Sequence, residues 1–186
     1  MKMNDRLSRF LSQYLLTPLV NEYVNITSHS AAVLVPIINH PHTPTLLFTQ
    51  RSHQLRHHPG QVAFPGGKRD QTDSSLYETA LRETYEEVGI PPQFIQKIGE
   101  LPTVNSRSGH SVKPFLALVQ PGFPLNPNSD EVAEVFEVPL EYLVETNNYA
   151  SLPVGQPHAQ RQVHFLPYGS HLIWGMTATI LLHLPS

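Results

Sequence analysis

Apolar side chains recur at two different spacings along this chain, and the change between them predicts alternating strands and helices. Apolar or alternating runs bounded by turn residues predict strands over residues 31–39, 45–50, 62–64, 95–101, 114–119 and 162–167. Helical patterns cover residues 7–16, 140–144 and 175–184, and one more helix lies between Ser75 and Gly89. This mixed order predicts an α/β sandwich, whose first helix is expected to pack on the body or to contact a second copy.

Proline positions refine the pattern. Pro36 has no N–H to offer a neighbouring strand, so the first strand is predicted to lie at a sheet edge or to carry a bulge. Residues 121–127 are rich in proline and are predicted to be a loop, because the stretch is too short for a domain linker. With 186 residues and no internal repeat, the chain is expected to form one domain over residues 1–186, with a helical extension at residues 1–25.

The helix that follows Ser75 has well-marked ends and carries most of its charge near its C-terminus. Ser75 and Glu78 form a capping box, and Gly89 followed by two prolines predicts the stop. At roughly 100° per residue, three acids are predicted to share one side of this helix: Glu83, Glu86 and Glu87. The opposite, packing side is predicted to hold Tyr77, Leu81, Thr84, Tyr85 and Val88.

Three acids at helical spacings of three and four repel one another, at a cost of about 0.2–0.5 kcal/mol for each pair. A hard divalent cation would remove this repulsion, and carboxylate oxygens suit Mg²⁺ or Mn²⁺. The pattern therefore predicts a metal site formed by Glu83, Glu86 and Glu87. A solvated acidic helix face is the alternative interpretation.

The same segment resembles the Nudix box of the Nudix hydrolase superfamily. The matching positions are Gly67, Arg82, Glu83, Glu86, Glu87, Gly89 and Ile90. Two positions depart from the box: Asp73 precedes Arg82 by eight intervening residues instead of seven, and Thr84 replaces an aliphatic residue. The resemblance implies that the helix acids hold divalent metals against a diphosphate, and it leaves the role of Asp73 open.

A second resemblance lies upstream of the box. Residues 47–52, Arg56, Gly60 and residues 64–67 are similar to the signature of coenzyme A pyrophosphatases within the Nudix superfamily, and residues 174–178 are typical of the same branch. This resemblance implies a Nudix-type α/β/α sandwich with a mixed sheet. It also implies hydrolysis of the diphosphate bond of coenzyme A, or of a derivative, to 3′-phospho-AMP and 4′-phosphopantetheine or its acyl form.

Five residues are candidates for substrate binding. Arg51 and Arg56 match the upstream signature, and arginine suits bidentate contacts to phosphate. Gly66 and Gly67 lack a Cβ, so their N–H groups can approach a phosphate closely, although a tight turn alone explains them equally well. Lys68 follows directly and adds positive charge.

Candidate catalytic residues are Glu86, on the helix, and Glu131 and Glu134 in the acidic run at residues 130–139. Nudix enzymes commonly place one more glutamate in such a run, as a metal ligand or general base. We rank Glu131 before Glu134, and a solvated strand remains the alternative for either. A metal-bound water would be the nucleophile, with a nearby carboxylate taking its proton.

Composition excludes several other kinds of site. The chain has no cysteine, which rules out disulfides and thiolate zinc sites and fits a reducing compartment. The adjacent His57 and His58 do not predict a transition-metal site, because neighbouring side chains rarely aim at one ion. With a net charge of −3, the chain is not expected to present a general nucleic-acid-binding surface. It contains no apolar stretch of 18 residues, so no membrane span is predicted.

We therefore expect a cytoplasmic protein that binds a small-molecule substrate and Mg²⁺ or Mn²⁺, with neither nucleic acid nor membrane as a partner and with a homodimer as a possible assembly. Two alternatives stay open. In the first, the chain is a Nudix hydrolase of another nucleoside diphosphate derivative; in the second, it is a non-catalytic Nudix module that senses a nucleotide.

Overall fold

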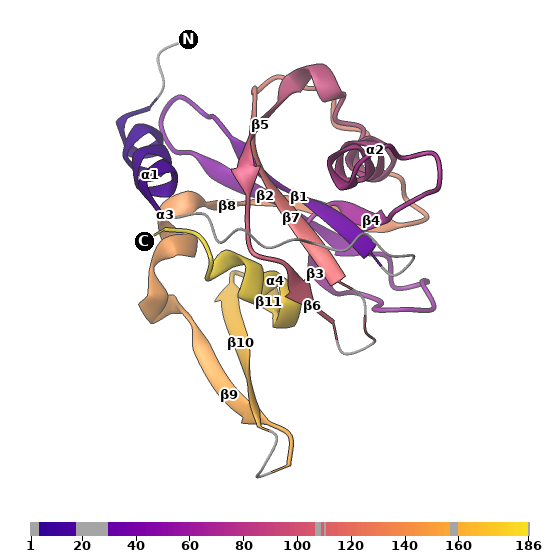
Figure 1. The fold of residues 1–186 in the computed structure, drawn as a ribbon, viewed down its shortest axis with the longest axis vertical. Coiled ribbons are helices and arrows are strands. Elements are labelled where there is room, and N and C mark those ends of the chain that lie inside the picture. Colours follow the sequence, from indigo (N-terminus) through magenta and orange to yellow (C-terminus); the bar gives the residue numbers. More distant parts are fainter. Residues whose placement is uncertain (1–3, 18–29, 107–108, 110, 157–159, 186) are drawn as a thin grey trace.

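The computed structural model describes residues 4–17, 30–106, 109, 111–156 and 160–185. Helices lie on both faces of a large mixed sheet, and a smaller three-stranded sheet extends from one end (Figure 1). The strands of the large sheet are β1 (Ser30–Ile38), β2 (Thr45–Arg51), β3 (Val62–Ala63), β4 (Gly66–Lys68), β5 (Ile95–Glu100), β6 (Val104–Asn105), β7 (Ser111–Val119) and β8 (Val132–Pro139). The predicted α/β/α sandwich is confirmed.

The centre of the large sheet is the parallel pair β1 and β7, and its other pairings are antiparallel. β1 meets β2 only at Ile37 and Ile38, next to the turn that joins them. Beyond that point the two strands separate, and the segment from β3 to β4 fills the gap: β3 pairs with β2, and β4 pairs with β1. The glycine turn is thereby held in the middle of the sheet.

Pro36 shows why this opening is tolerated. β1 is a central strand, so the prediction that Pro36 marks an edge or a bulge is wrong. The N–H of Leu34 donates to the carbonyl of Pro65 on the side of β1 that faces the gap, and Pro36, two residues on, directs its nitrogen to the same side. Because β2 has already turned away there, no hydrogen bond is lost.

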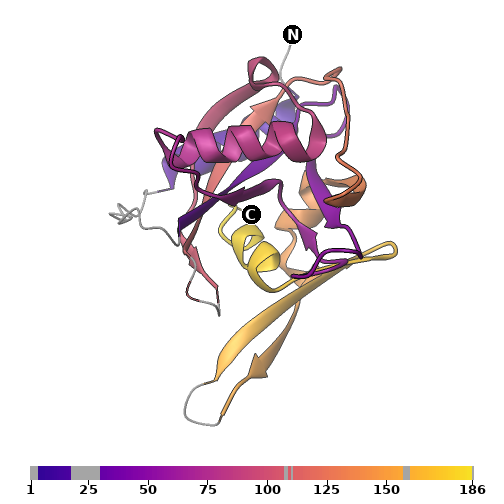
Figure 2. The same ribbon diagram turned by 90° about the vertical axis from the view of Figure 1, so that its right-hand side faces the viewer.

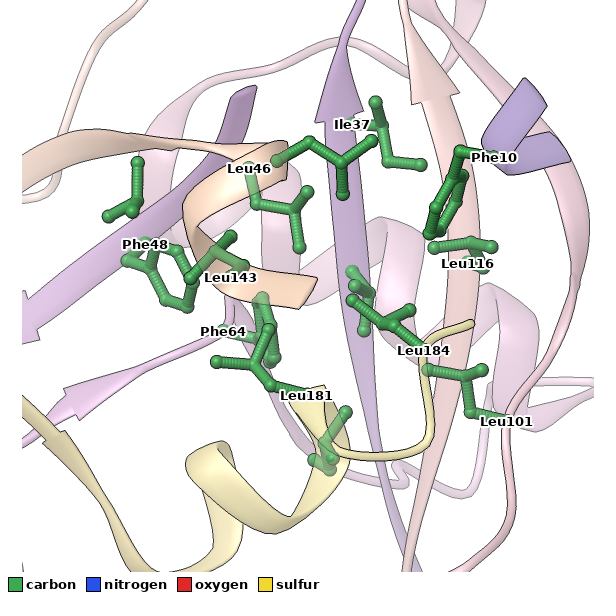
Figure 3. Packing of buried hydrophobic residues seen from close by; sticks show 14 of the residues in the cluster. Phe10, Ile37, Leu46, Phe48, Phe64, Leu101, Leu116, Leu143, Leu181 and Leu184 are labelled. Atoms are coloured by element: carbon green, nitrogen blue, oxygen red, sulfur yellow. The ribbon is translucent and has the colours of Figure 1, made fainter. Parts of the chain in front are cut away.

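Helix α2 (Leu76–Val88) covers one face of the large sheet, while α1 (Asp5–Leu16), α3 (Leu140–Val144) and α4 (Gly175–Leu181) cover the other (Figures 1 and 2). Under α2, Leu76 and Ala80 pack on Leu34 and Phe115. On the opposite face, Phe48, Leu116 and the helix residues Phe10, Leu143 and Leu181 form the larger core (Figure 3). These two cores hold the three layers together.

Helix α1 packs against its own chain. Its side chains Leu7, Phe10, Leu11 and Tyr14 are buried, and the Tyr14 hydroxyl donates to the carbonyl of Glu100 at 2.9 Å. A Cβ on Gly99 would lie 2.2 Å from that hydroxyl, so only glycine fits beneath it. Of the two roles expected for this helix, packing is therefore the one seen; residues 18–25 of the predicted extension lie outside the described residues.

Several short elements were not predicted. These are β4, β6, the 3-10 turns at Pro92–Phe94 and Thr146–Asn148, and the outer strands β9 (Ala150–Val154) and β11 (His171–Trp174), which flank β10 (Arg161–Tyr168). β7 begins at Ser111, three residues before the prediction, and α4 ends at Leu181 instead of residue 184. No helix in the described parts of the chain is long and apolar enough to cross a bilayer.

Candidate active site

Helix α2 begins and ends where the sequence predicts. The Ser75 hydroxyl accepts the N–H of Glu78 at 3.1 Å, which satisfies one of the unpaired donors of the first turn. Gly89 closes the helix in the left-handed conformation, with φ of 76°, and donates its N–H to the carbonyl of Tyr85. These fixed ends set which way every acid of the helix points.

The three acids of α2 differ in burial, which corrects the prediction that the side carrying them lies opposite the packing side. Side-chain exposure falls from 52% for Glu86 to 17% for Glu83 and 5% for Glu87. Glu87 lies on the side that packs against the sheet, whereas Tyr85, predicted to pack, is exposed. The acids therefore run from solvent into the interface between α2 and the sheet.

Gly66 and Gly67 receive these buried acids. The N–H of Gly66 donates to Glu87 Oε2 at 3.2 Å. A Cβ on Gly67 would lie 2.4 Å from the Glu83 carboxylate carbon, so Glu83 occupies the space that a side chain would need. A Cβ on Gly66 would lie 2.3 Å from the carbonyl oxygen of Ala32 in β1. Gly66 is thus required by close packing against the backbone of β1, whereas a side chain at position 67 would displace the Glu83 carboxylate; both glycines position the acids of α2.

Asp73 and Arg82 form the support of the site. Arg82 donates through Nε and Nη2 to the two Asp73 oxygens, both at 3.0 Å, and through Nη1 to Glu83 at 3.0 Å and Glu86 at 2.9 Å. Asp73 is buried and also accepts the Thr79 hydroxyl at 2.9 Å. The Arg82 contact, aided by these hydrogen bonds, lowers the pKa of Asp73 to about 2. Asp73 therefore orients Arg82, which in turn holds two acids of α2.

Burial dominates the electrostatics of Glu87. It raises the pKa of Glu87 to about 8, against the opposing effects of the Gly66 N–H and Arg51, and with added repulsion from Glu83 and Glu131. Burial likewise raises the pKa of Glu83, opposed by Arg82 and reinforced by Glu86 and Glu131. Without a cation, burial therefore favours the protonated, uncharged form of Glu87, and a nearby cation would favour its carboxylate form.

The two glutamates of the acidic run lie in different places. Glu131 lies near the acids of α2: its N–H donates to the carbonyl of Asn128, whose own N–H donates to the Glu87 carbonyl at 2.9 Å, and its charge contributes to raising the pKa of Glu83 and Glu87. Glu134 is on the other face of β8, the face that carries Phe136 into the larger core, and its Oε2 lies 3.1 Å from His171 Nε2. The structure brings Glu131 to the candidate site and does not bring Glu134 there.

The basic candidate residues also lie in different places. Arg51 lies beside the acids, with Nη1 3.8 Å from Glu87 Oε1, and its buried Nε has no hydrogen-bond partner among the described residues. Arg56 and Lys68 are exposed, and the Lys68 carbonyl accepts Arg82 Nη2 at 3.2 Å.

The donor set suits a hard divalent cation. No three acidic or histidine side chains of the described residues meet closely enough to hold an ion, because Arg82 holds Glu83 and Glu86 while Glu87 faces Gly66. The chemistry nevertheless fits: the ligands are carboxylate oxygens, and the deepest of them lacks a cation within hydrogen-bond distance. Glu83, Glu86 and Glu87 are the residues that would hold Mg²⁺ or Mn²⁺.

Comparison with known proteins bears on the whole chain. The NUDIX domain model matches residues 28–156. A protein of Pectobacterium atrosepticum named "Uncharacterized Nudix hydrolase NudL" is 46% identical over 182 residues, covering 98% of this chain and 92% of that protein. A protein of Yersinia pestis with the same name is 46% identical over 164 residues, covering 88% and 82%.

Solved structures agree with these matches at the level of the fold. A MutT/nudix family protein from Enterococcus faecalis has a TM-score of 0.55 at 19% identity, with 96% of this chain and 67% of that one covered. An Ap4A hydrolase of C. elegans has a TM-score of 0.52 at 24% identity, with 60% and 80% covered. At these identities the likeness establishes the architecture alone.

Proposed function

Because the chain belongs to the Nudix hydrolase family, whose members act on pyrophosphate bonds, we propose that its substrate is coenzyme A or an acyl derivative of it. The products would be 3′-phospho-AMP and 4′-phosphopantetheine or its acyl form. The observation that carries the hydrolytic part is the seating of Glu83 and Glu87 on Gly66 and Gly67, which gathers buried carboxylates beside an arginine.

A divalent cation, when bound, supplies positive charge to the diphosphate and lowers the pKa of a water molecule. Glu83, Glu86 and Glu87 would hold it. Arg82, fixed by Asp73, orients Glu83 and Glu86 and keeps them from turning away. These residues bear net negative charge in the absence of substrate and metal, so the site has high electrostatic complementarity to a cation.

Glu131 is the residue we assign as the proton acceptor. It belongs to the acids of the site without being one of the three helix ligands, and its backbone is fixed because its carbonyl accepts the N–H of Ser52 at 2.8 Å. A carboxylate placed beside metal ligands can take the proton of an attacking water. Glu134 pairs with His171 on the other face of β8 and is not needed for this step.

Arg51 is the principal phosphate-binding residue of the proposal. Guanidinium groups carry five N–H donors, and the buried Nε of Arg51 has none of its hydrogen-bonding capacity used by the described residues. A phosphate oxygen would satisfy it with a charge-assisted bond. Arg56 is exposed on the loop that follows β2 and is available for a second phosphate, such as the 3′-phosphate of coenzyme A.

Product analysis tests the reaction. Purified protein is incubated with Mg²⁺ or Mn²⁺ and coenzyme A, and the products are identified by mass. We expect 3′-phospho-AMP, and we expect its formation to stop with excess chelator and to fall at least about a hundredfold in Glu83→Gln. Cleavage of other nucleoside diphosphate derivatives but not coenzyme A would reject the substrate; tight binding without turnover would indicate a sensing module.

A second experiment tests the arginines. Arg51→Ala and Arg56→Ala are compared on coenzyme A and on dephospho-coenzyme A, which lacks the 3′-phosphate, with the exposed Arg9→Ala on α1 as a matched control. A lost charge-assisted contact costs about 1.5–3 kcal/mol, or roughly ten- to more than a hundredfold in kcat/KM. A selective loss on coenzyme A assigns that arginine to the 3′-phosphate. Equal losses on both substrates reject this assignment.

A further inference from the structure

The small sheet β9–β10–β11 has one face composed almost entirely of apolar side chains. Directly paired residues of neighbouring strands point to the same face, and the register places Leu152 opposite Val163 and Phe165 opposite Trp174. The members of this apolar face are Ala150, Leu152, Val154, Val163, Phe165, Pro167, Leu172 and Trp174. Among the described residues, the one charged side chain on it is Arg161, at its outer end.

This apolar face is open to solvent. Leu152 is 57% exposed and Trp174 is 39% exposed, and Val154 and Leu172 are also exposed. The rings of Phe165 and Trp174 stack with centroids 6.2 Å apart, so the face is ordered at its centre. Figures 1 and 2 show why the body leaves it open: the β9–β10 hairpin extends away from the large sheet.

The opposite face of the same sheet differs from the apolar face in its burial and its polarity. Near the body that face is buried, with Leu166 and Ile173 in the larger core. Towards the tip it becomes polar: Gln162 is exposed, and the Ser151 hydroxyl lies 2.8 Å from His164 Nδ1. A hairpin that presents polar groups on one side and, apart from Arg161 at its outer end, apolar groups on the other has a solvent face and a contact face.

We propose that the apolar face of β9–β10–β11 is the contact surface of a homodimer, in which the same face of a second copy packs against it. A two-fold pair of flat apolar faces is self-complementary and places no like charges at its centre. On α1, the other candidate for this role, Leu7, Phe10, Leu11 and Tyr14 are buried in their own chain, and the exposed apolar side chains are Leu15 and Leu16 at its C-terminal end. The second copy completes the burial that the body provides only for the opposite face.

Pro153 determines how the two copies meet. β9 is one of the two outer strands of the small sheet, and its edge is a place to which another strand can add. Pro153, the fourth of the five residues of β9, has no N–H to donate to an added strand, and proline is a common means of blocking such edges. Packing of one face on another requires no edge hydrogen bonds, so it is the arrangement that this sheet permits.

The available area sets the strength of the dimer. A patch of eight partly exposed apolar side chains offers roughly 500 Å² per copy, which is the size of the largest apolar patch on a typical monomer. Two copies together bury on the order of 1,000 Å², at the lower limit for specific interfaces. We therefore expect a dissociation constant in the range of about 1–100 µM.

Sedimentation of the full chain tests the proposal with two variants on the same hairpin. Leu152→Glu places a charge on the apolar face, and Gln162→Glu places the same charge on the opposite face at another exposed position. We expect wild type and Gln162→Glu to dimerise, and Leu152→Glu to show a dissociation constant at least about tenfold higher. Thermal melts followed by circular dichroism verify that both variants fold. Monomeric wild type at about 100 µM, or equal dimerisation of the two variants, overturns the proposal.

Trp174 provides an independent reading, because it is the single tryptophan of the chain and lies on the apolar face. Its emission should shift to longer wavelength on dilution, over the same concentrations at which the sedimenting mass falls. An emission independent of concentration overturns the proposal. A shift caused by an acyl coenzyme A in chelator, with no change in mass, also overturns it, since the acyl chain would then be the occupant.

Discussion

Replacing Glu87 with glutamine is expected to stabilise the metal-free protein while it abolishes catalysis. The unfolded chain releases the Glu87 proton near pH 4.5 and the folded chain near pH 8. The folded state therefore binds more protons between these values, and its stability falls as pH rises through them. Glutamine cannot ionise, keeps the acceptor oxygen for the Gly66 N–H, and should escape this loss.

The magnitude follows from the two pKa values. At about 1.4 kcal/mol for each pH unit between 4.5 and about 8, ionised Glu87 costs the fold at most about 5 kcal/mol above pH 8. About 2–3 kcal/mol of this develops between pH 6 and pH 9. The free energy of unfolding of Glu87→Gln should therefore exceed that of wild type by about 2–3 kcal/mol more at pH 9 than at pH 6.

Urea unfolding in chelator, followed by far-ultraviolet circular dichroism at both pH values, measures this difference. Asp130→Asn removes an exposed carboxylate near Glu131 and is the matched control; it should change the pH dependence little. Activity with saturating Mg²⁺ should fall at least about a hundredfold in Glu87→Gln. A stability difference that is the same at pH 6 and pH 9 would refute the argument that burial holds Glu87 protonated.

Three further predictions concern other parts of the site. Gly67→Ala should lower kcat at least about tenfold while the protein stays folded, because the new methyl group displaces the Glu83 carboxylate; native kcat would contradict the packing seen here. Glu131→Gln should lower kcat about a hundredfold or more and Glu134→Gln less than about threefold, and equal effects would remove the distinction between them. Asp73 has a lowered pKa, so its stabilisation is present above pH 3.8 and lost as pH falls towards 2; acid unfolding of wild type and Asp73→Asn should show the loss, about 2 kcal/mol, in wild type alone.

Local signals accounted for much of the fold. The capping box and Gly89 fixed both ends of α2, because end signals act through nearby backbone groups. Such local signals are missing for β9 and β11, which were not predicted. β9 contains a proline and small residues, and its pairing with β10 depends on contacts outside the segment. Pro36 was misinterpreted because its lost N–H matters only where a neighbouring strand is present.

The residues of the candidate site were predicted, but the burial of their side chains was not. Helical periodicity placed Glu87 with Glu83 and Glu86 opposite the packing side, but the N–H of Gly66 and the missing Cβ of Gly67 allow acids to enter the interface between α2 and the sheet. The contact of Asp73 with Arg82 joins a loop to the helix nine positions later, which no helical spacing predicts. Glu131 precedes β8, whereas Glu134 lies within it and contacts His171, so the separation of the two depends on where the strand begins.

Because β1 and β2 separate, the residues that would carry out hydrolysis can be retained while the loop that would contact the substrate changes. The loop after β2 is closed at its base by hydrogen bonds between the backbones of Arg51 and both Gly60 and Gln61. β3 is then anchored to β2, and β4 to β1, so Gly66 and Gly67 keep their places whatever the loop does. Evolution, or an engineer, can lengthen or exchange residues 53–59 to change the preferred substrate without rebuilding the hydrolytic centre.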